Sequence, residues 1–320
     1  MTKSDLKIVF FGTPDFAVAS LEKLVDGGYN VAAVVTMPDK PAGRGQQILQ
    51  SDVKKYAVAH NLPVLQPEKL KSEEFVAELR RINADLFIVI AFRMLPEVVW
   101  QMPPKGTFNL HASLLPKYRG AAPLNWAVIN GDKETGVTTF FLKHEIDTGD
   151  IIQQKRIEIK DSDNVGTVHD KLMNLGAEMV VETVDAIITG TVKTVPQSKL
   201  SEGTEPTPAP KIFKDTCHIV WDNPAQRLHN LVRGLSPYPA AWCSFEKDGK
   251  EHQLKIFETA PTSMPANGVM PGTVRTDKDS IYVACADHFL QILSLQLSGK
   301  KRMDSAAFLR GFSLGGIVLK

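Results

Sequence analysis

Cysteine is scarce in this 320-residue chain. There are three cysteines, Cys217, Cys243 and Cys285, an odd number without C-x-x-C spacing. A disulfide framework and a thiolate metal site are therefore not expected. This usage fits a reducing compartment, and we expect a cytoplasmic protein.

Long hydrophobic runs are also missing. Near the N-terminus, charges at Lys3, Asp5 and Lys7 accompany a short apolar run that ends in KIVFFG, too short for a signal sequence. Hydrophobic residues make up 43% and charged residues 23% of the chain, which is ordinary for a globular protein. We expect neither export nor a membrane partner.

No sign of charge dominates, because the formal net charge is +1. From residue 206 onward there are 14 basic and 10 acidic residues. This surplus is compatible with a polyanionic partner and equally with an ordinary solvated surface. The histidines of this part lack any spacing that converges on a metal, so no metal is predicted.

A G-x-G-x-x-G fingerprint is absent, which argues against dinucleotide binding. In its place, the apolar run 6–11 ends at Gly12 and is followed by Thr13-Pro14-Asp15. The pattern predicts a buried strand and then a helix, with Thr13 as its cap and Pro14 in its first position. Such a helix N-terminus is able to receive an anion or a ribose oxygen.

The remaining pattern predicts two domains, as the length suggests. Apolar strands separated by helical patterns indicate an α/β sheet, and four prolines make 191–210 a linker. Short segments beyond it suggest a small β-barrel or sandwich. We expect strands at 31–36, 84–91, 107–110 and 137–142, a helix at 167–188 ending at Gly190, and domains at 1–190 and 211–320.

The most informative stretch is TFNLHASLLPKYRG at 107–120. Asn109 and His111 lie two residues apart at a predicted strand end and so point to the same face. The carboxyl ends of parallel strands are where open α/β sheets build their sites. An Asn and a His there could also simply satisfy the backbone of the following loop.

Two further segments carry polar residues. In DTGD, Asp147 and Asp150 lie in a predicted tight turn, where aspartate often only bonds the local backbone. The segment 38–55 combines prolines and glycines with Lys40 and Arg44, so we expect a flexible, positively charged loop. Composition alone favours a solvated loop over a nucleic-acid contact.

Together, N-x-H-x-S-L-L-P-x-Y-R-G, G-D-x-x-T-G-V-T and D-x-G-D resemble the folate-dependent formyltransferases. FFGTPDFAV, MPDKPAGRG and the terminal LVRGLSPYPAAW look like the branch that formylates initiator methionyl-tRNA. The resemblance implies a Rossmann-like, mostly parallel sheet followed by a small C-terminal β-barrel of the OB-like type. It also implies that 10-formyltetrahydrofolate is the donor and that no metal takes part.

The resemblance assigns roles residue by residue. The formyl group would pass to the α-amine of initiator methionyl-tRNA, giving N-formylmethionyl-tRNA for translation initiation. The acceptor arm and CCA end of the tRNA would be bound by a monomeric enzyme. The implied residues are Asn109, His111 and Asp147 for catalysis; Ser113, Leu114, Leu115 and Pro116 for folate; and Gly12, Thr13, Pro14, Lys40 and Arg44 for the tRNA and its aminoacyl end.

One position departs from the pattern. Arg93, in AFRMLP, stands where many relatives have glycine, which puts the local folate contacts in doubt. Formyltransferases that act on glycinamide ribonucleotide or on amino sugars remain alternatives that share the core chemistry. A tRNA-binding protein without catalysis is the alternative from another class.

Overall fold

The computed structural model describes residues 1–42, 47–200 and 206–320. The chain divides into two compact units, which are treated separately below. Unit 1 comprises Met1–Pro123, Thr135–Ile157 and His169–Ala209, and unit 2 comprises Leu124–Glu134, Glu158–Val168 and Pro210–Lys320.

Unit 1 is built on a seven-stranded sheet in the order β10-β9-β7-β6-β1-β2-β5. The pairs β1–β2, β1–β6, β2–β5 and β6–β7 are parallel, and β7–β9 is antiparallel. The expected mostly parallel α/β sheet is therefore confirmed. The strands are β1 (Lys7–Gly12), β2 (Asn30–Val35), β5 (Val64–Leu65), β6 (Leu86–Ile90), β7 (Thr107–His111), β9 (Glu134–Phe141) and β10 (Ile151–Glu158).

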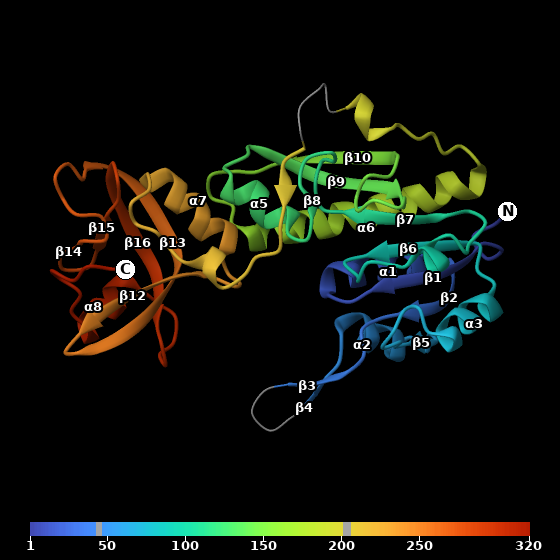
Figure 1. Cartoon of the computed structure of the whole chain (residues 1–320), viewed down its shortest axis with the longest axis horizontal. Coiled ribbons are helices and arrows are strands. Elements are labelled where there is room, and N and C mark those ends of the chain that lie inside the picture. Colours follow the sequence, from blue (N-terminus) through green and yellow to red (C-terminus); the bar gives the residue numbers. More distant parts are fainter. Residues whose placement is uncertain (43–46, 201–205) are drawn as a thin grey trace. The chain divides into compact units, whose positions relative to one another are not determined.

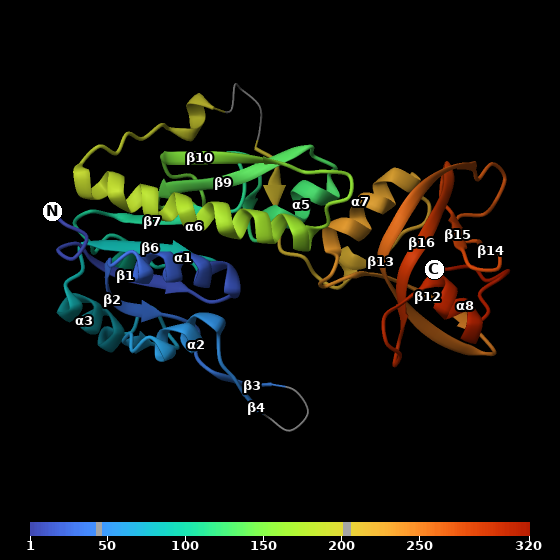
Figure 2. The ribbon, with the colours of Figure 1, turned by 180° about the vertical axis from the view of Figure 1, so that it is seen from behind.

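Helices cover both faces of this sheet. On one face, Val9 of β1 and Val89 of β6 share an apolar cluster with residues of α3 and α4. On the other face, α6 runs across the strands (Figure 2), and its Gly176 lies against Leu110 of β7. The helices are α1 (Asp15–Asp26), α2 (Asp52–Ala59), α3 (Glu73–Ile82), α4 (Glu97–Trp100) and α6 (Val165–Thr189).

Two local expectations are wrong. Helix α1 begins at Asp15 with extended Pro14 as its N-cap, and no side chain caps it, so Thr13 is not the cap. The segment 38–55 is not a simple loop either. It contains a hairpin of β3 (Lys40–Ala42) and β4 (Gln47–Leu49) and the start of α2, because Ser51 caps α2 by accepting a hydrogen bond from the Lys54 N–H.

The described part of 191–210 folds against the rest of unit 1. A short 3-10 helix, η1 (Gln197–Lys199), is followed by β11 (Pro208–Ala209), which pairs with β8 (Arg119–Gly120). In Figure 1, β11 is the short unlabelled yellow arrow beside the label of β8. This part of the chain therefore contributes to the loops at the carboxyl edge of the sheet.

Unit 2 contains a six-stranded sheet in the order β12-β13-β16-β15-β14, with β17 beside β16. Its described pairs are antiparallel and the sheet curls as a half-barrel (Figure 1), in agreement with the expected OB-like domain. The elements are α5 (Pro123–Ile129, from Leu124), α7 (Ala225–Leu235), β12 (Ala241–Lys247), β13 (Lys250–Pro265), β14 (Val274–Thr276), β15 (Ile281–Ala284), β16 (His288–Leu297), β17 (Met303–Asp304), α8 (Ser305–Gly311) and the 3-10 helix η2 (Asp215–Cys217).

An apolar core fills unit 2. All three cysteines are free and buried in it. Burial raises the pKa of the Cys285 thiol to about 12 and shifts the pKa of the Cys243 thiol upward as well. These thiols are therefore packing residues. In the described parts of both units, none of the helices has the length and apolarity to cross a bilayer.

Candidate active site

Strand β7 places Asn109 and His111 on one face of the sheet. In register, Asn109 lies between Val89 of β6 and Phe140 of β9, and His111 lies beside Thr138. Leu110, between them, faces α6 on the opposite side. The alternation along this strand therefore brings two polar side chains together where β7 ends, as the sequence predicted.

The side chain of Asn109 is half-buried, and among the described residues its amide has no hydrogen-bond partner. An amide carries both donors and an acceptor. Asn109 therefore offers an unused donor at the carboxyl edge of the sheet. A purely structural asparagine would be expected to bond the neighbouring loop.

His111 is buried, and its two ring nitrogens have different surroundings. The Nε2 atom lies 2.8 Å from the carbonyl oxygen of Tyr118. Since a carbonyl only accepts, Nε2 carries the proton and donates it. The Nδ1 atom lies 3.9 Å from Oδ2 of Asp147, too far for a direct hydrogen bond. The ring is thus fixed by Tyr118 and faces Asp147 with its other nitrogen.

Asp147 occupies a left-handed backbone conformation, with a φ of 55°. Its Oδ2 accepts a hydrogen bond of 2.9 Å from the Gly120 N–H. In the same turn, a Cβ on Gly149 would lie 1.6 Å from the carbonyl oxygen of Phe141, so only glycine fits there. In the D-x-G-D pattern, the glycine is therefore required by the close approach of the backbone, and the first aspartate is the candidate catalytic residue.

The loop that follows His111 is held by internal hydrogen bonds. The hydroxyl of Ser113 donates to the Lys117 carbonyl, and Thr138 donates to the Ser113 carbonyl and accepts from the Leu115 N–H. The Gln154 amide donates to the Leu115 carbonyl. Of the four predicted folate residues, Ser113 and Leu115 are buried, while Leu114 and Pro116 are partly exposed.

A buried glutamine that no sequence pattern marks as functional joins this group. Gln197 donates to the carbonyl oxygens of Asp147 and Gly149 and accepts from the Arg119 guanidinium. Gln197 lies 48 and 50 residues from Gly149 and Asp147 in sequence and 78 residues from Arg119. No local motif marks it, and only the fold reveals it.

The residues expected to meet the aminoacyl end lie where β1 ends. Gly12 closes β1, and the hydroxyl of Thr13 is buried without a hydrogen-bond partner among the described residues. The Thr13 carbonyl accepts from the Val53 N–H of α2. Lys40 is exposed on β3, and Arg44 lies outside the described residues.

Arg93 is bound to protein carbonyls. Its guanidinium donates to the carbonyl oxygens of Pro67 and Glu68 at 2.7 and 3.0 Å and lies over the Phe92 ring. Burial holds its pKa below the ordinary value. At this departure from the family pattern, the side chain ties the loop after β6 to the loop after β5.

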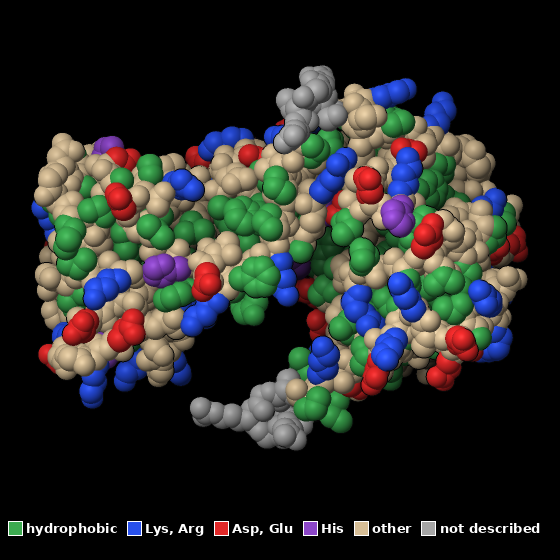
Figure 3. Space-filling model, in the orientation of Figure 1, with side chains coloured by type: hydrophobic (Ala, Val, Ile, Leu, Met, Phe, Trp, Pro, Cys, Tyr) green, Lys and Arg blue, Asp and Glu red, His purple; other side chains and the backbone are tan. Residues whose placement is uncertain are grey.

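In unit 2, three basic side chains that are candidates for phosphate contacts differ in their surroundings. Lys211 and Lys214 are exposed and lie near the rings of Phe213 and Trp242. Arg302 is paired with Glu258 at 2.6 Å, which partly neutralises it. In the space-filling view, Lys and Arg side chains on this face of unit 2 are interspersed with acidic ones (Figure 3).

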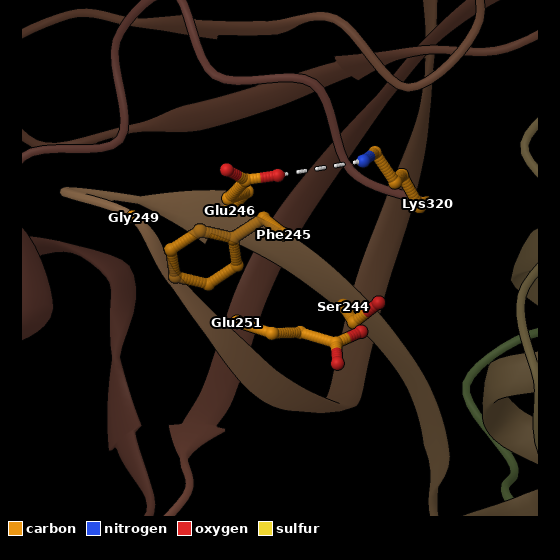
Figure 4. A pocket seen from close by; sticks show the side chains of 6 residues that line it. All are labelled: Ser244, Phe245, Glu246, Gly249, Glu251 and Lys320. Carbon is orange, nitrogen blue, oxygen red and sulfur yellow. Dashed lines mark ion pairs between the residues drawn. The ribbon is translucent and has the colours of Figure 1, made fainter.

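A polar hollow of about 290 Å³ also lies in unit 2, where Glu246, Glu251 and Lys320 surround Phe245 (Figure 4). Glu246 and Lys320 form an exposed ion pair at 4.0 Å. The hollow lacks the combination of amide, imidazole and carboxylate found in unit 1. No group of three His, Cys, Asp or Glu side chains that could hold a metal occurs within the ranges that the structure describes.

The arrangement of Asn109, His111 and Asp147 suits an acyl-type transfer, in which an oxyanion is stabilised and a proton is moved. Residues 6–184 match the formyl transferase family, and residues 211–313 match the C-terminal domain of formyl transferases. The chain therefore belongs to the formyl transferase family.

Relatives define the branch. The chain is 61% identical to a methionyl-tRNA formyltransferase of Bacteroides fragilis over 98% of this chain and 97% of the relative. It is 50% identical to that of Flavobacterium johnsoniae, with 96% of each chain covered. Within the family, the chain groups with the methionyl-tRNA formyltransferases.

Solved structures share the fold at lower identity. A sugar 3N-formyl transferase, WlaRD, crystallised in the presence of dTDP and 5-N-formyl-THF, has a TM-score of 0.64 and 20% identity, covering 92% of this chain and 99% of that one. HypX from Aquifex aeolicus, in complex with tetrahydrofolic acid, has a TM-score of 0.63 and 18% identity, covering 96% of this chain and 47% of that one.

Proposed function

We propose that this chain transfers the formyl group of 10-formyltetrahydrofolate to the α-amine of initiator methionyl-tRNA. The observation that carries the proposal is the meeting of Asn109, His111 and Asp147 at one sheet edge, in a chain 61% identical to a methionyl-tRNA formyltransferase. The product would be N-formylmethionyl-tRNA for translation initiation, which makes the cytoplasm the proposed location.

The folate donor supplies an activated formyl group and a nitrogen that leaves. The residues at the carboxyl end of β7 fit a folate donor. Asn109 has an amide that no described residue engages, and Leu114 and Pro116, in the loop that follows β7, are partly exposed. Ser113 and Leu115 would support the loop from within through their buried contacts. Solved structures with this fold have been determined with folate compounds, among them WlaRD with 5-N-formyl-THF and HypX with tetrahydrofolic acid.

The attacking amine must be neutral, and it forms a new C–N bond to the formyl carbon. Charge then develops on the formyl oxygen, where the Asn109 amide and a protonated His111 Nδ1 would donate hydrogen bonds. A proton leaves the attacking nitrogen and reaches the folate nitrogen as the old C–N bond breaks. Asp147, 3.9 Å from His111 Nδ1, would stabilise the charged imidazole and relay this proton through water.

We assign recognition of the acceptor to three parts of the chain. Gly12, Thr13 and Pro14 would lie against the aminoacyl end of the CCA terminus, and the buried free hydroxyl of Thr13 supports this assignment. Lys40 and Arg44 would contact the acceptor arm. Lys211 and Lys214 would add phosphate contacts from the C-terminal domain.

The proposed organisation is a catalytic domain at 1–190, a connecting segment at 191–210 and a tRNA-binding domain at 211–320, acting as a monomer. The matches to the two family domains at 6–184 and 211–313 support this division. Light scattering of the purified protein would test the monomer.

The test of function is a comparison of acceptors. The purified chain is incubated with 10-formyltetrahydrofolate and, separately, initiator methionyl-tRNA, glycinamide ribonucleotide or an amino sugar nucleotide. We expect formylation of the tRNA alone. Formylation of another acceptor at a higher kcat/KM would reassign the substrate, and binding of tRNA without formyl transfer would overturn the proposed reaction.

A further inference from the structure

Gln197 uses its whole amide to connect three backbone or side-chain groups around the site. The residue is only 3% exposed to solvent. The Nε2 atom donates to the Asp147 carbonyl at 2.8 Å and to the Gly149 carbonyl at 2.9 Å. The Oε1 atom accepts from Nη2 and Nε of Arg119 at 2.7 and 3.2 Å.

Each hydrogen-bonding position of this amide is therefore occupied. A buried primary amide has two donors and an oxygen with two lone pairs, and here all four are matched. Fully satisfied buried polar networks restrict a structure to one arrangement. An apolar side chain of the same size would leave two carbonyls and a guanidinium without this partner.

The group that Gln197 holds is the turn that carries Asp147. The left-handed φ of 55° at Asp147 is unusual for a residue with a side chain. Its carboxylate is held separately, by the Gly120 N–H. Arg119 and Gly120 are neighbours on β8, so this short strand holds Asp147 in two ways. The Gly120 N–H binds the carboxylate directly, and Arg119 binds Gln197, which in turn binds the Asp147 backbone.

The same strand region fixes His111. The Tyr118 carbonyl, directly before Arg119, accepts from Nε2 of His111. Three consecutive residues thus set the position of the imidazole, of the carboxylate and of the turn beneath it. The 3.9 Å separation between His111 and Asp147 depends on this shared anchor.

We infer that Gln197 is a positioning residue for the formyl transfer, acting through Asp147; this inference rests on the proposed function. It orients the Asp147 carboxylate toward His111 without contacting either substrate. Its loss lowers kcat and leaves folate binding nearly unchanged, because the Ser113–Pro116 loop has its own supports in Thr138 and Gln154.

Gln154 offers the matched contrast. It is also a glutamine whose amide donates to a backbone carbonyl at 2.8 Å, but that carbonyl belongs to Leu115. Its loss acts on the loop proposed to meet folate. We expect Gln154→Met to raise KM for 10-formyltetrahydrofolate more than it lowers kcat.

The experiment measures kcat, both KM values and the melting temperature for Gln197→Met, Gln197→Glu and Gln154→Met. Small misplacements of a reacting group cost up to about a hundredfold in rate, and we expect kcat to fall about tenfold or more in Gln197→Met. Gln197→Glu keeps an acceptor for Arg119 but loses both donors, so its kcat should fall by about as much. Gln296→Met, which removes an amide-to-carbonyl bond in unit 2, is the control and should match the unmodified enzyme.

A double-mutant cycle with Asp147→Asn separates positioning from general damage. Residues that act through one another are strongly non-additive. In single-turnover assays, adding Gln197→Met to Asp147→Asn should cost less than threefold. A full, additive loss in the double variant would overturn the inference, as would an unchanged kcat in Gln197→Met.

Failure of the proposed function has a different signature. If the unmodified chain forms no formylmethionyl-tRNA, the proposed function fails and not merely the role of Gln197. If the unmodified chain is active and Asp147→Asn is unimpaired, the role of Asp147 fails together with this inference. If both behave as expected and only Gln197→Met is silent, the inference alone fails.

Discussion

The active-site edge of unit 1 and the core of unit 2 differ in the side chains that they bury. In unit 1, polar side chains at the carboxyl edge of the sheet are buried and bonded to backbone, among them His111, Ser113, Thr138 and Gln197. In unit 2, a continuous apolar cluster fills the core and includes the cysteines, although single polar side chains such as Arg233 and Ser305 are also buried. The hydrogen-bonded polar side chains fix the orientation of the reactive groups, and the apolar cluster mainly stabilises the fold.

This difference follows from the energetics of burial. A buried polar group is costly unless its hydrogen bonds are made, so a polar interior has few alternative arrangements. Apolar contacts are non-directional and tolerate rearrangement. The chemistry is therefore expected to depend on single atoms in unit 1, and unit 2 is expected to respond to changes in volume and surface charge.

The largest effect on activity is expected from Asn109→Ala. Loss of one oxyanion donor costs on the order of a hundredfold or more in kcat, while the half-buried position of Asn109 predicts little change in stability. Turnover and melting temperature of the purified variant test this. A rate within a few-fold of the unmodified enzyme would contradict the role of Asn109.

Leu290→Ala tests the apolar interior of unit 2. Leu290 is fully buried, and truncation of a buried leucine costs about 2–5 kcal/mol. We expect a lower denaturation midpoint for unit 2. Tryptophan fluorescence would report this unfolding, because Trp221 and Trp242 lie in unit 2. Under conditions where the variant is folded, kcat should remain within a few-fold; a collapse of kcat would show that the two interiors are not independent.

Arg44→Ala addresses the part of unit 1 proposed to contact the acceptor arm. Hydrogen bonds to charged groups are worth about 1.5–3 kcal/mol, so kcat/KM for initiator methionyl-tRNA should fall roughly tenfold or more. Binding of 10-formyltetrahydrofolate, measured by calorimetry, should not change. An equal loss of both would indicate damage to the fold.

Lys214→Ala is the counterpart in unit 2. A phosphate contact is weakened by salt, and removal of one such contact lowers the slope of log affinity against log salt by about 1. We expect a loss of a few-fold in tRNA binding at low salt, measured by filter binding. Arg302→Ala should change binding less, because Glu258 already pairs with Arg302; the reverse order would refute the assignment.

The smallest effect concerns His229 in unit 2. Burial, aided by the charge of Arg233, holds the His229 pKa below its ordinary 6.5. The unfolded chain therefore binds the proton more readily, and the stability of unit 2 should fall as pH drops below about 6.5. Melting curves between pH 7.5 and 5.5 should show a smaller decline in His229→Gln; identical declines would remove His229 as the cause.

Much of the fold could be predicted from local patterns. The strands β1, β2 and β6 are apolar runs bounded by turn residues, β7 and β9 were expected from shorter segments, and α6 ends directly before the expected Gly190. The hairpin within 38–55 and the seven-residue helix α8 were not predicted, because short elements carry little periodicity. Helix α7 was also missed, although its buried residues Leu228, Val232 and Leu235 follow helical spacing. Thr13 matched a capping pattern, but its hydroxyl is buried and has no hydrogen-bond partner in the part of the chain that the structure describes.

The candidate site divides in the same way. Asn109, His111 and Asp147 were selected from spacing and from resemblance, and the strand alternation at β7 follows from the sequence alone. The partner of each was not. The packing of distant segments decides these partners, which are Tyr118 for His111, Gly120 for Asp147 and Gln197 for the turn.

The sequence by itself determined the α/β sheet, the edge at which the polar residues lie and the family to which the chain belongs. Those features depend on local periodicity and on motifs that are continuous in the chain. Only the tertiary structure decided that His111 Nε2 is engaged and that Asp147 is held from both sides. A hydrogen bond between Arg119 and Gln197 joins residues 78 positions apart, and no local pattern encodes such a contact.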